Sequence, residues 1–229
     1  MNLIDLENES VRELNARLHV GNNNEPSSPD EWRVSHPHGK HCLAVGLQTA
    51  HKISIKGHAD YYCGGINKAV AITVKGQCGK GLGENIMSGQ ICVEDNAAEA
   101  AGASGHGGMV VIGGDASSCC GISIKGVDIV VKDSVGHMSG FMAQAGNLVI
   151  CGDADDDLGD SIYEARIYVR GKTGALGADC VEKEMTAEHT EALAALLDKA
   201  GMACGAEDFR RFGSALKLYN FDIDNAENY

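Results

Sequence analysis

Ile53-Ser-Ile-Lys-Gly57 is the first copy of a pattern that is found seven times between residues 53 and 171. Each copy alternates apolar and mixed side chains and closes on glycine or aspartate. The copies begin at Ile53, Ile72, Ile91, Met109, Ile129, Leu148 and Ile167. The intervals between successive starts are 19, 19, 18, 20, 19 and 19. Self-similarity at a nearly fixed period of this size indicates a repeat architecture, in which each copy packs against the next.

Each copy is predicted to form a short strand with one buried face. The position two residues after each start is also apolar, and it holds Ile55, Val74, Val93, Val111, Val131, Ile150 and Val169. Because side chains of a strand point alternately to its two faces, an apolar residue at every second position predicts a strand that is half buried.

Glycines recur at three positions of the repeat and predict three corners in each coil. The corner glycines are Gly57, Gly64, Gly76, Gly83, Gly89, Gly102, Gly108, Gly126, Gly140, Gly146, Gly152, Gly159 and Gly171. Glycine adopts positive φ without steric cost, as a sharp corner demands. The sides between corners are six or seven residues long, too short for a helical crossover of about a dozen residues. The sequence therefore predicts an all-β fold, a single-stranded right-handed parallel β-helix of about seven coils with short flanking helices at both termini.

Three segments follow from this prediction: an N-terminal helix and loop extension at 1–50, the β-helix at 51–180, and a C-terminal helical cap with a docking tail at 181–229. Ser10 and Glu13 have the spacing of a capping box, which predicts a helix from Val11. Its apolar stripe either covers the open first coil or docks on another chain.

Near the C-terminus, Thr186 is expected to cap a helix that runs to Ala200 and stops at Gly201. A second helical piece is expected at 206–212. Both would cover the last coil, which otherwise exposes an unpaired strand edge. The tail at 216–229 is rich in acidic and aromatic residues, which favours docking.

The overall charge disfavours nucleic acid and anionic membranes as partners, because 19 basic residues stand against 32 acidic ones and the net charge is -13. We find no hydrophobic signal region near Met1 and no apolar stretch of eighteen residues, so the expected location is cytoplasmic. The nine cysteines are then expected to be reduced. Cys63 and Cys119 share one repeat position and are expected to be small buried residues, while the adjacent pair of Cys119 and Cys120 stands out.

Two clusters raise the hypothesis of a metal site. His36, His38 and His41 lie close together around Pro37 and Gly39, and imidazole is a common metal ligand, but no regular element would make the three rings converge. Loop histidines near an interface are the preferred interpretation.

The second cluster, Asp153–Asp157 with Glu164, approaches the spacing of a calcium loop, but Leu158 replaces the glycine that such a loop needs. A solvated acidic corner is the preferred interpretation.

No catalytic or cofactor-binding residue is predicted. Gly79–Gly83 is rich in glycine, but no Gly-Lys pair of the chain has the glycine that a Walker A loop requires, and Glu84 replaces the third glycine of a dinucleotide fingerprint. His58, His106 and His137 occupy different positions of the repeat and are not expected to form one patch.

The glycine rhythm of Gly76-Gln-Cys-Gly-Lys-Gly-Leu-Gly83 and Gly102-Ala-Ser-Gly-His-Gly-Gly108 resembles the GXGXG domain, which forms the C-terminal part of the glutamate synthase large subunit. The stretches at 11–19 and 217–229 are most similar to the stand-alone GXGXG subunit of N-methylglutamate synthase, also called methylamine-glutamate N-methyltransferase. The repeat departs from the family pattern between Met109 and Gly126, where a shorter coil precedes a longer one, and at Ala178, where a glycine is expected.

The resemblance implies a non-catalytic scaffold subunit in a hetero-oligomer. Its partners would be a glutamate synthase-like FMN subunit, which also carries an iron-sulfur cluster, and a glutamine amidotransferase-like subunit. Together they would convert glutamate and methylamine to N-methylglutamate and ammonia. The chain itself is expected to contribute no catalytic residue, no cofactor-binding residue and no metal ligand.

The sequence leaves three alternatives open. The chain could be the GXGXG subunit of a split glutamate synthase or of formylmethanofuran dehydrogenase. A hexapeptide-type acyltransferase, which could use His106 or His137 as general base, belongs to a different class. That fold requires strict multiples of six, whereas the corners here are spaced by seven, six and six residues.

Overall fold

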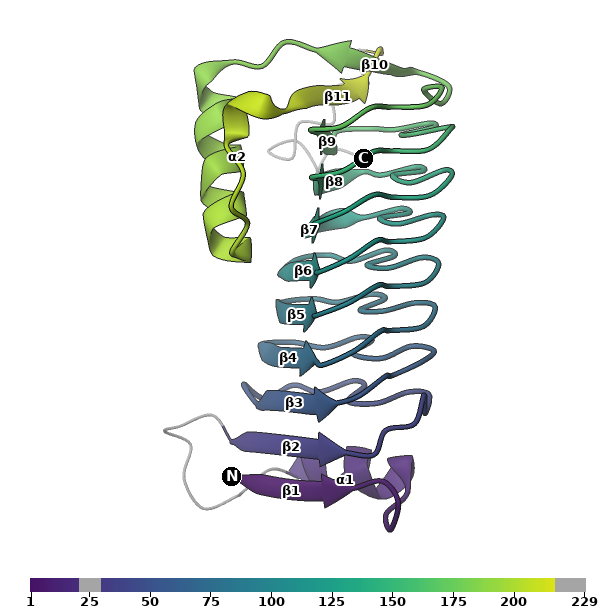
Figure 1. Cartoon of the computed structure of the whole chain (residues 1–229), viewed down its shortest axis with the longest axis vertical. Coiled ribbons are helices and arrows are strands. Elements are labelled where there is room, and N and C mark those ends of the chain that lie inside the picture. Colours follow the sequence, from purple (N-terminus) through teal and green to yellow (C-terminus); the bar gives the residue numbers. More distant parts are fainter. Residues whose placement is uncertain (21–29, 217–229) are drawn as a thin grey trace, which may run out of the picture.

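The computed structural model describes residues 1–20 and 30–216 of the chain. Within these ranges its strands form a single eleven-stranded sheet with the order β1-β2-β3-β4-β5-β6-β7-β8-β9-β11-β10 (Figure 1). The strands are β1 (Asn2–Asp5), β2 (Glu31–Ser35), β3 (Lys52–Lys56), β4 (Val70–Val74), β5 (Gly89–Val93), β6 (Met109–Ile112), β7 (Lys125–Val131), β8 (Ala145–Ile150), β9 (Arg166–Val169), β10 (Cys180–Lys183) and β11 (Arg210–Ser214). The helices are α1 (Val11–Val20), α2 (Ala187–Ala200) and a 3₁₀ turn, η1 (Ala206–Asp208). In the described ranges, neither α-helix has the length and apolar character that a membrane span needs.

Strands β1 to β9 pair in parallel, each with the next one in sequence. A second side of the coil is also in register, through parallel bridges that join Ala59, Cys78, Ala97, Ala116, Val135, Ala154 and Thr173. Because the chain returns to the same two sides once per repeat, the coils stack along one axis (Figure 1). The predicted parallel β-helix is confirmed.

The register of β6 corrects one detail of the sequence prediction. Val110, and not Met109, pairs with Ile91 on one side and Ile129 on the other. The coils therefore start at a constant interval, and the predicted slip between a shorter and a longer coil is wrong. Because residues 109–112 are all apolar, the pattern is equally consistent with a copy that starts at Met109 and one that starts at Val110. Only the hydrogen-bonded register distinguishes the two starts. Val110 and Ile112 line the interior core.

The predicted corner glycines fall into two groups with different physical roles. Positive φ is adopted by Gly57, Gly64, Gly83, Gly89, Gly102, Gly108, Gly126, Gly140, Gly146 and Gly159. At Gly76, Gly152 and Gly171 the expectation of positive φ is wrong. These three lie against the backbone of the preceding coil: a Cβ atom on Gly152 would lie 2.6 Å from the carbonyl oxygen of Asp133. They are needed for close approach of two backbones.

The N-terminal extension at 1–50 contributes two strands that were not foreseen. β2 pairs with β3, and β1 pairs with β2, so the sheet begins at Asn2. The predicted helix is present as α1, and its capping box is formed, since the Ser10 amide donates to Glu13 Oε2 at 2.7 Å. Leu14 and Leu18 are buried in the core of the solenoid. The helix therefore covers the open first coil.

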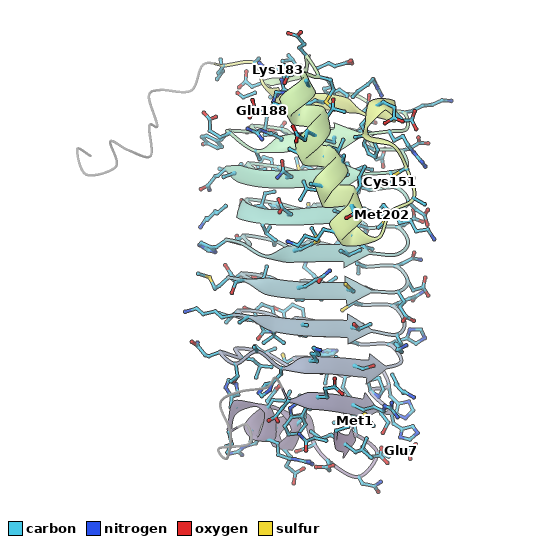
Figure 2. All side chains as sticks on the ribbon, turned by 90° about the vertical axis from the view of Figure 1, so that its left-hand side faces the viewer. Met1, Glu7, Cys151, Lys183, Glu188 and Met202 are labelled. Carbon is cyan, nitrogen blue, oxygen red and sulfur yellow. The ribbon has the colours of Figure 1, made fainter. Side chains whose placement is uncertain are left out.

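The C-terminal end differs from the predicted lid. α2 has the expected Thr186 cap and ends at Gly201, but it lies along the outer face of the sheet, where Leu193 and Leu197 pack in one cluster with Val149 and Tyr168 (Figures 1 and 2).

The end of the solenoid is closed by β11, which pairs antiparallel with both β9 and β10. The predicted helical piece at 206–212 is wrong beyond η1, because Arg210–Ser214 is needed as a strand on the open edge of β9. The predicted docking tail lies outside the described residues from 217 onward.

Candidate functional site

The histidine motif at 36–41 does not converge into the three-histidine site considered from the sequence. His36 Nδ1 lies 2.7 Å from Asp5 Oδ1, and His38 Nε2 lies 3.6 Å from Glu7 Oε1. His41 points elsewhere and pairs with Asp60 at 3.0 Å. Two of the three histidines thus meet carboxylates of the first strand and turn. Sequence reasoning missed Asp5 and Glu7, because it did not foresee the pairing of β1 with β2.

The contact between His36 and Asp5 shifts both groups toward their charged forms. The hydrogen bond from His36 lowers the pKa of Asp5, and the same bond raises the pKa of His36. Both groups are exposed, so the pair is screened by solvent and contributes little to stability. Asp5, Glu7 and His36 have ligand atoms that all lie within 4.8 Å of one another.

The acidic segment at 153–157 is used by the coil itself. Asp153 Oδ1 accepts a hydrogen bond from the Lys172 amide at 2.7 Å, and Asp156 Oδ1 accepts one from the Ala175 amide at 2.7 Å. Asp157 pairs with His137 at 3.5 Å. The carboxylates therefore bind backbone groups of the next coil or a neighbouring side chain, and they do not converge as a calcium loop would.

A ladder of polar side chains runs through the same corner of successive coils. Each member accepts a hydrogen bond from the backbone amide of the equivalent residue one coil later, at 2.7 to 3.0 Å. The accepting side chains are Asn96, Asp115, Ser134 and Asp153. These hydrogen bonds are exposed, so each contributes modestly, and together they join four successive pairs of coils at this corner.

The three histidines of the repeat remain apart, as predicted. His58 Nδ1 accepts a hydrogen bond from the Gln77 amide at 2.9 Å, and His137 faces Asp157. His106 is exposed on another side of the coil. The structure thus does not combine His106 and His137 into one acid–base site.

Cys119 and Cys120 differ in burial, although they are adjacent in the chain. Cys120 is fully buried in the interior core and occupies the column of Cys63, so the placement of Cys119 in that column is wrong. Burial raises the pKa of the Cys120 thiol to about 12. Cys119 is half-buried.

We expect a maleimide to modify Cys119 and to leave Cys120 intact in the folded chain. The thiolate is the form that reacts with maleimide. At Cys120 burial keeps the thiol protonated and also keeps the reagent away from the sulfur atom. Peptide mapping after a short reaction at neutral pH would measure both rates on one peptide, with the denatured chain as control. Equal labelling of the two cysteines in the folded chain would contradict the register assigned to this coil.

Two pairs of exposed apolar side chains lie on the same side of the solenoid. Ile66 is 46% exposed and Met87 is 36% exposed; we call them the lower patch. Met142 is 37% exposed and Tyr163 is 41% exposed; we call them the upper patch. The Met87 amide donates to the Asn67 carbonyl, and the Tyr163 amide donates to the Ala143 carbonyl, both at 2.8 to 2.9 Å. Each patch therefore joins two adjacent coils in the same way.

The two patches are related by the repeat. Ile66 and Met142 occupy the same position of coils that are four repeats apart, and so do Met87 and Tyr163. At about 4.8 Å per coil, the two patches lie about 19 Å apart along the axis. The equivalent positions between them are polar: Asn85, Ser104, Ser123, His106, Lys125 and Gln144.

Comparison with known proteins gives one full-length relationship. No protein-family model matches the chain, and no solved structure matches it. Protein GlxC from Rhizobium meliloti (strain 1021) is 50% identical to this chain over 230 residues, which covers 100% of both proteins. Identity at this level along the whole length includes every coil and both capped ends, so the chain belongs to the family of protein GlxC.

Proposed function

We propose that this chain is the non-catalytic scaffold subunit of an N-methylglutamate synthase, a relative of glutamate synthase. In this proposal a glutamate synthase-like subunit carries FMN and an iron-sulfur cluster, and a glutamine amidotransferase-like subunit is the second partner. The complex converts glutamate and methylamine to N-methylglutamate and ammonia. The present chain holds both partners and contributes no cofactor.

The observation that supports a scaffold is the repeated surface. A solenoid with a constant coil length presents the lower and upper patches in the same orientation, about 19 Å apart. Exposed apolar residues that are grouped together mark sites of protein association, and polar positions separate the two groups. This arrangement suits a rigid element that binds two different chains side by side. The polar side chains of the ladder bind backbone amides of the next coil, so their role in this proposal is structural.

The proposal is tested by isolating the complex through a tag on this chain and assaying it with methylamine and with ammonia. We expect two companion subunits, turnover of methylamine by the complex, and no turnover by this chain alone. A complex that uses ammonia but not methylamine would assign the chain to a split glutamate synthase. Turnover by the isolated chain would refute the scaffold role.

Paired substitutions test the two patches separately. Ile66→Glu with Met87→Glu should release one companion, and Met142→Glu with Tyr163→Glu should release the other, because a charge at the centre of an apolar contact is desolvated without a partner. His106→Glu, at the same coil position as Met87 and Tyr163, is the matched control and should release neither. The proposal fails if both companions are retained by both double variants while the melting temperatures are unchanged.

A further inference from the structure

The N-terminal end of the solenoid carries a mixed cluster of two histidines and two carboxylates. Asp5 ends β1 and Glu7 lies in the turn after it, while His36 and His38 follow β2 directly. His36 Nδ1 lies 2.7 Å from Asp5 Oδ1 and 4.0 Å from Glu7 Oε2. Glu7 Oε1 lies 3.6 Å from His38 Nε2. Ligand atoms of Asp5, Glu7 and His36, from two separate segments, all lie within 4.8 Å of one another, and His38 adjoins this group beside Glu7, which Figure 2 labels.

The backbone brings the two imidazoles to the same side. His36 and His38 both have positive φ, of 51° and 46°, although neither is glycine. Their rings stack with centroids 5.8 Å apart and planes 22° from parallel. In β1 and β2, Asp5 pairs with Ser35, so the end of the first strand lies next to the start of the histidine motif.

The carboxylate of Asp5 is also held in place by its own turn. Asp5 Oδ1 accepts a hydrogen bond from the Glu7 amide at 3.1 Å, and Asp5 Oδ2 accepts one from Asn8 Nδ2 at 3.1 Å. Such outer contacts orient a ligating carboxylate in known metal sites.

The donor set and its dimensions match zinc. Zinc is bound by imidazole nitrogen and carboxylate oxygen at about 2.0 to 2.1 Å in tetrahedral geometry, which places neighbouring ligand atoms about 3.3 Å apart. The separations of His36 Nδ1 from the nearest oxygens of Asp5 and Glu7, 2.7 and 4.0 Å, bracket that value. All four side chains are between 38% and 63% exposed, so a hydrated ion can enter without opening the fold.

We propose that Asp5, Glu7 and His36 bind one zinc ion, with water in the fourth position, and that this ion joins the first turn of the chain to the corner after β2. An ion bound only by the folded state stabilises that state in proportion to its concentration. The zinc thus fastens the N-terminal end of the solenoid, on the side where α1 covers the first coil.

The test is a zinc titration of the full-length chain, free of any affinity tag and treated with a chelator beforehand. We expect one zinc per chain, a rise in melting temperature with zinc, and at least about tenfold weaker binding after His36→Asn or Glu7→Gln. His41→Asn is the matched control, because His41 belongs to the same motif and also faces a carboxylate, Asp60, outside the cluster. It should leave the affinity unchanged.

Three outcomes overturn the proposal. The first is that the chain does not bind one zinc ion saturably. The second is that the zinc affinity is unchanged in both His36→Asn and Glu7→Gln. The third is that His41→Asn lowers the zinc affinity as much as His36→Asn does. Melting curves without zinc show that each variant is folded, so that a loss of binding is assigned to the lost ligand. Cobalt in place of zinc gives an independent readout, since a tetrahedral nitrogen and oxygen site produces visible absorption bands that the two ligand variants should lack.

Discussion

Gly146→Ala is expected to lower the free energy of unfolding by about 3 to 5 kcal/mol. Gly146 has φ of +95°, a conformation that is costly for any residue with a Cβ atom. The added Cβ would also clash with the carbonyl oxygen of Val127 and lie 2.9 Å from the carbonyl carbon of Gly126. Both neighbours are backbone atoms of the preceding coil, so relief requires the two coils to move apart.

Gly121→Ala is the matched control, and it should cost only about 1 to 2 kcal/mol. Gly121 also has positive φ, of +70°, but the nearest atoms to an added Cβ are side-chain carbons at 3.5 Å. Ala100 already adopts φ of 59° in another coil. Denaturant unfolding of the two variants separates conformational strain from backbone collision. Equal losses of stability would show that close coil packing at Gly146 adds nothing to the cost.

The repeat alone was sufficient to predict the β-helix. Period-two apolar residues and glycines at a fixed interval allow few other folds, since short sides exclude helical crossovers. The error at β6 arose because residues 109–112 are all apolar, so the pattern there has two equally good alignments. Hydrogen-bonded register is not encoded in apolarity, and it places Val110 in the interior.

The ends of the solenoid were predicted less well, because they do not repeat. β1 has four residues and only one buried side chain, Ile4, which is too short a pattern to recognise. The cap and the end of α2 were predicted correctly, but its partner was not. Leu193 and Leu197 pack on the outer face of the sheet, against Val149 and Tyr168, which the repeat places at mixed positions of a strand. The outer face of these strands is buried only because α2, a segment later in the chain, packs on it, and the repeat pattern of the strands does not show this.

The candidate zinc cluster illustrates the same limit at the level of a site. The sequence shows His36 and His38 as possible ligands, but no regular element predicted there would orient their rings. The missing groups, Asp5 and Glu7, lie much earlier in the chain, in a segment that looked like a plain acidic terminus. Pairing of β1 with β2 brings the two together. Only tertiary pairing could add the carboxylates to the histidines.

Ile72→Asp is expected to prevent folding, or to lower the free energy of unfolding by about 4 kcal/mol or more. Ile72 is 1% exposed and pairs in register with Ile53 and Ile91 inside the solenoid. A carboxylate at this place has apolar neighbours in both adjacent coils and no partner, so it must either be buried unpaired or force the coil open. Ile72→Ala, which keeps the site apolar, should cost about 2 to 5 kcal/mol and gives a measurable midpoint.

Thr73→Asp introduces the same carboxylate one residue later, and it is expected to change stability by no more than about 1 kcal/mol. Thr73 is half-buried on the outer face of β4, on the part of the sheet that α2 leaves uncovered (Figure 2). Water can therefore solvate the new charge there. Because the two positions share a strand and differ only in the face they occupy, the comparison measures the cost of the interior directly. If Thr73→Asp destabilised the chain as much as Ile72→Asp, the assignment of inside and outside along the coil would be wrong.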